Sequence, residues 1–140
     1  MLKKVINIIL LIAWMCLIFF FSSQNGDEST KSSGVFDNII NIIIKDDSVK
    51  PKVKYIIRKA AHFTEYCILA ILVLNVIRDY TNITYKTLIL AFILCALYAA
   101  SDEWHQTFVA GRVGQLMDVF IDSCGILTGL ILYKCFRKRK

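Results

Sequence analysis

The stretch VINIILLIAWMCLIFFF, residues 5–21, decides the class of fold because Asn7 is its only strongly polar side chain. Its length is close to the roughly 20 apolar residues that a helix needs to cross a bilayer. A secretory signal peptide would end in small residues at a cleavage site, whereas this stretch continues through FFFSSQ, residues 19–24. We therefore expect a retained membrane helix over residues 5–21.

Three further apolar stretches of similar length follow, and we expect helices at about residues 56–77, 84–104 and 116–136. Within lipid a helix satisfies its own backbone hydrogen bonds, which an open sheet does not. Of the 140 residues, 56% are hydrophobic, and the mean hydropathy of +0.56 is too high for an ordinary soluble domain. The sequence therefore predicts an all-α membrane protein with about four transmembrane helices, forming a single domain over residues 1–140.

The segment between the first two helices, residues 22–54, is polar at both ends and encloses an isoleucine-rich stretch at residues 35–44. That stretch is too short to cross a hydrocarbon core of roughly 30 Å. An amphipathic helix with its apolar face in the membrane interface suits it better. We expect such an interfacial segment between the first and second membrane helices.

The net charge of +6 would suggest a nucleic-acid partner in a soluble protein. Here the basic residues flank apolar stretches or end the chain, as in the cluster at residues 137–140, which is typical of cytoplasmic anchors beside anionic headgroups. No nucleic-acid-binding motif accompanies them, so we expect no nucleic-acid partner. Four spans return the chain to the side where it began, and we expect both termini in the cytoplasm.

Polar side chains gather at those ends of the predicted helices that would share the outer side of the membrane. They are Arg58, Lys59, His62 and Glu65 in the second helix, Asp102, Glu103 and His105 at the end of the third, and Arg112, Asp118 and Asp122 before or within the fourth. Helical spacing places Arg58, His62 and Glu65 on one face. The topology therefore predicts one polar site close to one surface of the bilayer.

The fourth predicted helix carries a stripe that strengthens this prediction. Asp118, Asp122, Gly125 and Gly129 follow one another along one face. Acids inside a membrane helix are expected to face the bundle interior or water, because exposure to lipid is costly. The two glycines would let a neighbouring helix approach the same stripe closely.

We assign Arg58, Lys59 and Arg112 to binding of an anion, since guanidinium and ammonium groups make strong hydrogen bonds to phosphate. The candidate acids, bases or cation ligands are His62, Glu65, Asp102, Glu103, His105, Asp118 and Asp122. The five acids outnumber the three basic residues by two, so a divalent cation or protonation of both histidines would offset the excess. The cofactor and the identity of any metal are left open.

Each group also has an ordinary structural interpretation. Arg58 and Lys59 are typical interfacial anchors, and Trp104 and Tyr66 suit an aromatic belt. The carboxylates are also candidates for structural ion pairs with Arg112 and Arg58. On that interpretation the polar residues fix helix packing and bind no ligand.

Ordered motifs along most of the chain carry a family resemblance. They are Phe21-Ser22-x-Gln24, Lys59-x-x-His62-Phe63-x-Glu65-Tyr66, Asp102-Glu103-x-His105-Gln106, Gly111-Arg112 and Asp118-x-x-x-Asp122-x-x-Gly125. With these motifs the chain resembles the VanZ-like family of bacterial integral membrane proteins, which implies a multi-pass protein of a bacterial cell membrane. Ala110 departs from the pattern, because the family often has proline before the Gly-Arg pair, so the turn that places Arg112 is expected to be looser.

The family's namesake is associated with resistance to teicoplanin, a lipoglycopeptide antibiotic that acts outside the membrane, which fits an outward-facing site. The resemblance supplies no established reaction. Our main hypothesis is a site that binds an anionic lipid or lipid-linked envelope precursor. If the protein is an enzyme, it would be a headgroup hydrolase or transferase at the outer leaflet. The alternative is a noncatalytic protein that alters antibiotic access, and a proton-coupled transporter is less favoured because the charges gather at one end.

Overall fold

The computed structural model describes residues 1–23, 49–109 and 116–137, and this part of the chain contains helices and no strand. The helices are α1 (Leu2–Ser23), α4 (Lys50–Tyr80), α5 (Tyr85–Gln106) and α6 (Leu116–Arg137). Each of the four contains a span that is long and apolar enough to cross a membrane. The prediction of an all-α protein with four membrane helices is confirmed.

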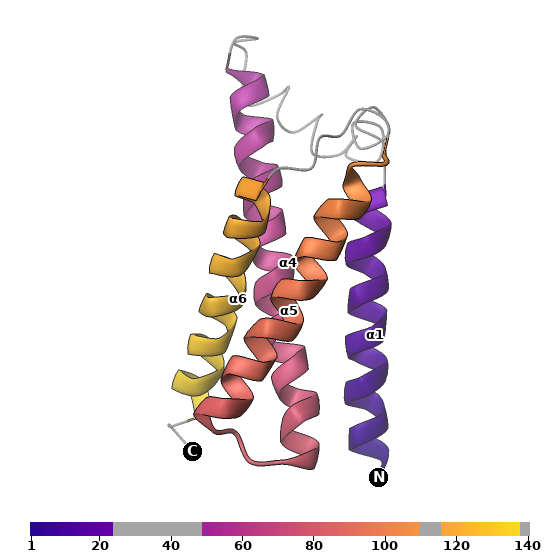
Figure 1. Ribbon diagram of the computed structural model, residues 1–140, viewed down its shortest axis with the longest axis vertical. Helices are drawn as coiled ribbons and strands as arrows, with labels where there is room; N and C mark the ends of the chain where they lie inside the picture. Colours follow the sequence, from indigo (N-terminus) through magenta and orange to yellow (C-terminus); the bar gives the residue numbers. More distant parts are fainter. Residues whose placement is uncertain (24–48, 110–115, 138–140) are drawn as a thin grey trace.

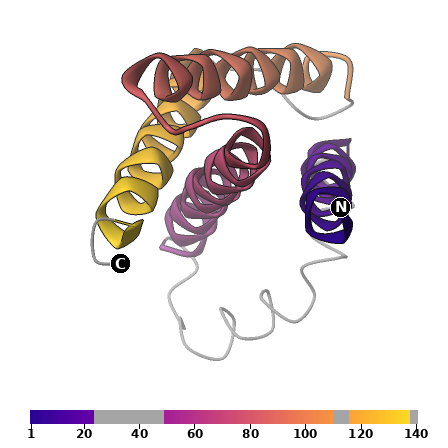
Figure 2. The ribbon, with the colours of Figure 1, turned by 90° about the horizontal axis from the view of Figure 1, so that it is seen from below.

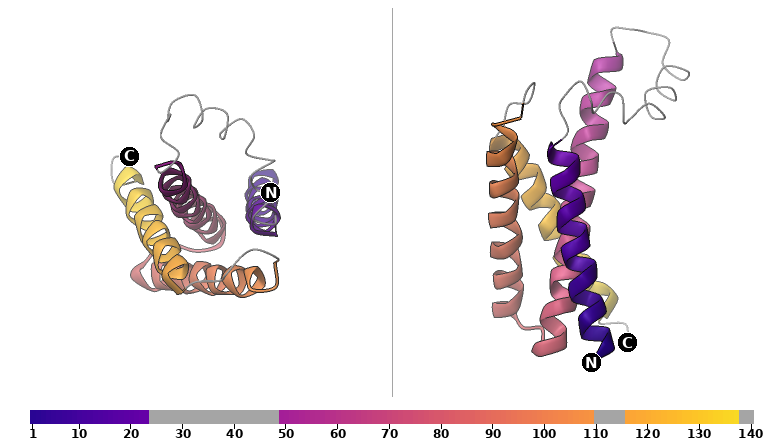
Figure 3. Two further views of the ribbon diagram at one scale, coloured as in Figure 1. Left: turned by 90° about the horizontal axis from the view of Figure 1, so that it is seen from above. Right: turned by 90° about the vertical axis from the view of Figure 1, so that its right-hand side faces the viewer.

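Helix α4 lies at the centre of the bundle and contacts each of the other three helices. Helices α1 and α6 lie on opposite sides of α4, and α5 covers a third side (Figure 2). The start of α1, the end of α6 and the link between α4 and α5 lie at one end of the bundle (Figure 1). At the opposite end, the first turns of α4 extend beyond the other helices (Figure 3).

The apolar stretches mark the helices but not their ends. Helix α4 runs from Lys50 to Tyr80, beyond the predicted residues 56–77 at both ends, and the link to α5 is only residues 81–84. Thr84 caps α5, because its side chain accepts from the Thr87 N–H while the Thr87 hydroxyl accepts from the Thr84 N–H at 2.7 Å. Backbone hydrogen bonding therefore continues into polar residues that hydropathy does not mark as helical.

The predicted interfacial segment, residues 22–54, is not confirmed. Ser22 and Ser23 belong to α1, and residues 50–54 belong to α4. Residues 24–48 lie outside the described part of the chain.

Two glycines of α6 bring its backbone against that of α4. A Cβ atom at Gly125 would collide with the Phe63 carbonyl oxygen and lie 3.1 Å from its carbon. At Gly129 it would collide with the Cys67 carbonyl oxygen and lie 3.1 Å from the Ala70 Cβ. The small residues thus permit close helix contact, as their spacing predicts. We call this contact the glycine seam.

Hydrogen bonds from side chains join helix α1 to α4 and α5, in addition to its apolar packing. The Trp14 indole donates to the Glu65 carbonyl oxygen at 3.0 Å, and the Tyr98 hydroxyl donates to the Met15 carbonyl oxygen at 2.7 Å. Nearer its start, the Asn7 amide donates to Asp79 Oδ2 at 2.6 Å. These bonds hold α1 against α4 and α5, so that its last turn reaches the site described below.

The outer surface of the bundle is apolar. Phe20 of α1, Ile89 and Leu97 of α5 and Phe120 of α6 are each at least 60% exposed. Such large apolar side chains in contact with water would be unfavourable over so wide an area. This surface is suited to contact with lipid. Polar side chains buried inside such a bundle are costly, so they indicate where a functional site could lie.

Candidate functional site

The buried polar side chains of the described residues come from all four helices and gather near one end of the bundle. They are Ser22 from α1, His62 from α4, Asp102, Glu103 and Gln106 from α5, and Asp118 and Asp122 from α6. Together with Lys59 and Tyr66, which contact them, we call these residues the polar cluster. Ionisable groups within a membrane bundle are costly and are typically functional.

The first contact in the polar cluster joins α4 to α6. Lys59 forms an ion pair with Asp118, and their side chains are only 13% and 8% exposed. The Lys59 ammonium also lies 5.0 Å from the centre of the Tyr55 ring. Lys59 therefore lies within the bundle rather than serving only as an interfacial anchor. The structural pairing expected for Asp118 was with Arg112 or Arg58, but the described residues place Lys59 there.

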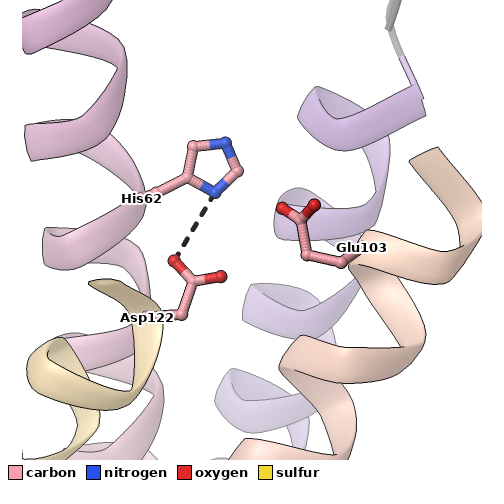
Figure 4. Close-up of side chains that lie close together, drawn as sticks. All are labelled: His62, Glu103 and Asp122. Carbon is pink, nitrogen blue, oxygen red and sulfur yellow. Dashed lines mark ion pairs between the residues drawn. The ribbon is translucent and has the colours of Figure 1, made fainter. Parts of the chain in front are cut away.

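A second group brings three helices together around His62, Asp122 and Glu103. Their nitrogen and carboxylate ligand atoms all lie within 4.8 Å of one another, and all three residues are buried. His62 Nδ1 is 3.7 Å from Asp122 Oδ1, while Glu103 approaches from α5 (Figure 4). One imidazole and two carboxylates in this arrangement are suitable ligands for a metal ion.

A third group surrounds the Asp102 carboxyl, one residue before Glu103. The Gln106 amide donates to Asp102 Oδ2 at 3.1 Å and to Glu103 Oε1 at 3.3 Å. The hydroxyls of Ser22 and Tyr66 lie beside the same Asp102 carboxyl. Three helices therefore converge on Asp102, and the Gln106 amide connects it to the His62 group.

Not every predicted site residue lies in the polar cluster. Arg58 is exposed and Glu65 is half-buried, both on α4. His105 is half-buried with its ring centre 4.4 Å from that of Phe19, so it packs against α1 and lies outside the three-residue group. Arg112 lies outside the described residues.

Three members of the polar cluster, Ser22, Tyr66 and Gln106, were absent from the predicted site. Tyr66 was expected in an aromatic belt, which is wrong, because its side chain is 0% exposed inside the bundle. Its spacing of four residues from His62 would have placed it on the inner face. Gln106 could have been placed in the same way, because it follows Asp102 by four residues and therefore lies on the same helix face. Its side chain is 1% exposed. Trp104, by contrast, is 69% exposed and free to lie at the membrane interface.

Comparison with known proteins identifies the family of this chain. The family model described as VanZ/LLP1 matches residues 7–137, which includes every member of the polar cluster. No curated protein and no solved structure matches the chain. Because the match covers nearly all of its 140 residues, the chain belongs to the VanZ-like family.

Proposed function

We propose that the polar cluster and its basic rim bind the anionic headgroup of a membrane lipid or of a lipid-linked envelope precursor at the outer leaflet. The observation that carries this proposal is the gathering of buried polar side chains from four helices at one end of an apolar bundle. A site at this depth is accessible to a headgroup while the acyl or prenyl chains remain in lipid.

A purely structural network would be expected to satisfy its own buried members. Asp122 departs from this, because it is 0% exposed and neither carboxylate oxygen has a hydrogen-bond partner among the described residues. Its nearest ionic contact, His62 at 3.7 Å, is too long for a good hydrogen bond. This carboxylate supports a ligand-binding role over one confined to helix packing.

The basic residues that would hold the anion lie at consecutive positions of α4. Arg58 is exposed at the rim, while Lys59 is directed into the bundle toward Asp118. Arg112, which precedes α6 in the sequence, is the third proposed anion-binding residue. A guanidinium group at the rim makes two-pronged hydrogen bonds to a phosphate, which a lysine does not.

The main alternative is a noncatalytic protein in which the polar cluster is structural and antibiotic access is altered indirectly. The buried Lys59–Asp118 pair favours that role for part of the cluster, since such pairs fix helix register. Catalysis by a hydrolase or transferase requires a proton donor or acceptor beside the headgroup. His62, Glu103 and Asp122 are the residues we propose for that role.

Binding of the headgroup is tested by removing the rim charge. In delipidated protein titrated with phosphatidylglycerol and followed by native mass spectrometry, Arg58→Gln is expected to lower occupancy about three- to ten-fold, through loss of a charge-assisted hydrogen bond. Because Arg58 is exposed, its replacement should leave the fold unchanged. A change in the mass of the bound lipid during incubation would indicate catalysis in addition to binding.

The matched control is Arg78→Gln, which removes the same charge from the other end of α4. It is expected to leave phosphatidylglycerol occupancy unchanged. With zwitterionic phosphatidylcholine, which should bind more weakly, Arg58→Gln and Arg78→Gln are expected to give the same occupancy. Equal losses in Arg58→Gln and Arg78→Gln would indicate nonspecific attraction to a basic protein and would contradict the proposed site.

The outward orientation of the site is also a proposal with its own test. Lys52 and Asn82 are both exposed and lie toward opposite ends of α4 and the following link. In a variant whose native cysteines are replaced, a cysteine at residue 52 should react with an impermeant thiol reagent in intact cells. A cysteine at residue 82 should react only after lysis, because both termini and this link would be cytoplasmic. The reverse pattern would place the polar cluster on the cytoplasmic side.

A further inference from the structure

We infer that His62, Glu103 and Asp122 form a binding site for one divalent metal ion of the zinc or manganese class. This inference deepens the proposed lipid site, because the three residues belong to the polar cluster. Metal binding does not require a bound lipid, however, so it is measured separately. The inference rests on three observations. The three side chains lie close together, Asp122 is buried without a hydrogen-bond partner among the described residues, and buried carboxylates surround it.

The geometry requires little rearrangement. The three ligand atoms lie within 4.8 Å of one another and come from three different helices, α4, α5 and α6. In Figure 4 the His62 ring and the two carboxylates project into the same space between these helices. Metal–ligand bonds of about 2.1 Å separate two ligand atoms by at most about 4.2 Å, so side-chain rotations that move atoms by under about 1 Å would complete the site.

Asp122 gives the second, independent observation. Its side chain is 0% exposed, and neither oxygen accepts a hydrogen bond from any described residue. A carboxylate removed from water without such a partner is strongly destabilised unless a cation or a proton compensates. The Asp122 carboxylate faces His62 and Glu103, which are metal-ligand side chains rather than fixed positive charges.

The charges around Asp122 also call for a compensating cation. Asp102, Glu103, Asp118 and Asp122 are all buried. Lys59 is paired with Asp118, and the Gln106 amide, which carries no charge, donates to Asp102 and Glu103. Lys59 also attracts Glu103 and Asp122, but a single ammonium group carries less charge than the four buried carboxylates. A divalent cation at Asp122 would therefore offset the remaining negative charge.

The donor atoms indicate which class of ion would bind. Imidazole nitrogen suits zinc and other transition metals, whereas magnesium prefers oxygen ligands and retains several waters. One histidine with two carboxylates is compatible with zinc or manganese. Three protein ligands also leave a coordination position for water or for a phosphate oxygen, as in catalytic rather than structural zinc sites.

The inference is tested with the full chain in neutral detergent, treated with chelator and then titrated by calorimetry with zinc, manganese or magnesium chloride, with no lipid added. We expect saturable binding of about one zinc or manganese ion per chain, and weaker binding of magnesium. Bound zinc should also raise the unfolding temperature, because the ion binds only the folded arrangement.

Ligand variants test the assignment. Asp122→Asn and Glu103→Gln should each weaken zinc binding by more than about 100-fold, since loss of an outer-shell partner alone typically lowers affinity about 10- to 100-fold. Asp102→Asn is the matched control. It removes an equally buried carboxyl next to Glu103 but outside the three-residue group, and affinity should change by less than about 10-fold.

Several outcomes would overturn the inference. The inference is wrong if the wild type does not bind zinc or manganese at one ion per chain, whatever the variants show. Binding that Asp102→Asn weakens as much as Asp122→Asn does would indicate general attraction to acidic residues. If Asp122→Asn fails to fold, Glu103→Gln and the wild-type titration decide the result. Lipid binding is measured separately, so loss of one proposal leaves the other testable.

Discussion

Replacing Gly125 with leucine is expected to abolish stable packing of α6 against α4, which is the largest effect we predict. Even a Cβ atom at Gly125 would collide with the Phe63 carbonyl oxygen and lie 3.2 Å from the Phe63 Cα. These are backbone atoms, so the clash cannot be relieved by rotating a side chain. Helices α4 and α6 would have to move apart. Overpacking a close contact commonly costs about 1–3 kcal/mol, and a leucine against backbone should exceed that range.

The effect would be measured as the yield of monodisperse protein and the midpoint of thermal unfolding in detergent. Gly129→Leu should behave similarly, because a Cβ there would meet the Cys67 carbonyl group. Cys135→Leu is the control, since residue 135 lies on the same helix and is exposed. It should alter stability by less than about 0.5 kcal/mol. An unchanged unfolding midpoint in Gly125→Leu would contradict the glycine seam.

Breaking the Lys59–Asp118 pair should have the second largest effect. Replacing Lys59 with methionine leaves the Asp118 carboxylate buried without its ionic partner. Removing one member of a buried ion pair typically destabilises a protein by about 3–5 kcal/mol. We expect a loss of this size in the free energy of unfolding, measured by reversible denaturation in mixed detergent.

Removing both charges should restore much of that loss, because Lys59→Met with Asp118→Leu leaves no uncompensated charge. The neighbouring Arg58→Gln is the control and should change stability by less than about 0.5 kcal/mol, since Arg58 is exposed. Strictly additive losses in the double variant would show that the two side chains do not act as a pair. A double variant that is stable but no longer binds phosphatidylglycerol would assign Lys59 a role in binding as well.

The four helices could be predicted because each apolar stretch is long enough to cross a bilayer. That property can be read from each stretch alone, without knowing which helices pack against it. Their ends could not, because helices such as α4 continue into polar residues that hydropathy does not distinguish from a loop. The glycine seam was predictable for a similar local reason. Gly125 and Gly129 are one turn apart, and this spacing is visible in the sequence.

Which polar side chains meet was harder to predict. Helical spacing indicated that His62 and Asp122 face the interior, and both are buried there. It did not indicate that Lys59 would pair with Asp118, because the pairing depends on how α4 and α6 are rotated and shifted along each other. The same limit applies to His105, which packs on Phe19 while His62 faces Asp122.

The Lys59–Asp118 pair also has a consequence for the order of events during synthesis. Lys59 lies in α4 and Asp118 in α6, so 59 further residues must be made before the pair can form. At about 5–20 residues per second this takes about 3–12 s. During that time α4 carries its lysine and His62 in the membrane without the carboxylates of α6. Both residues lie in the first half of α4, within reach of its polar start, where a lysine side chain can extend to the headgroups. We therefore expect the nascent helix to tolerate the delay.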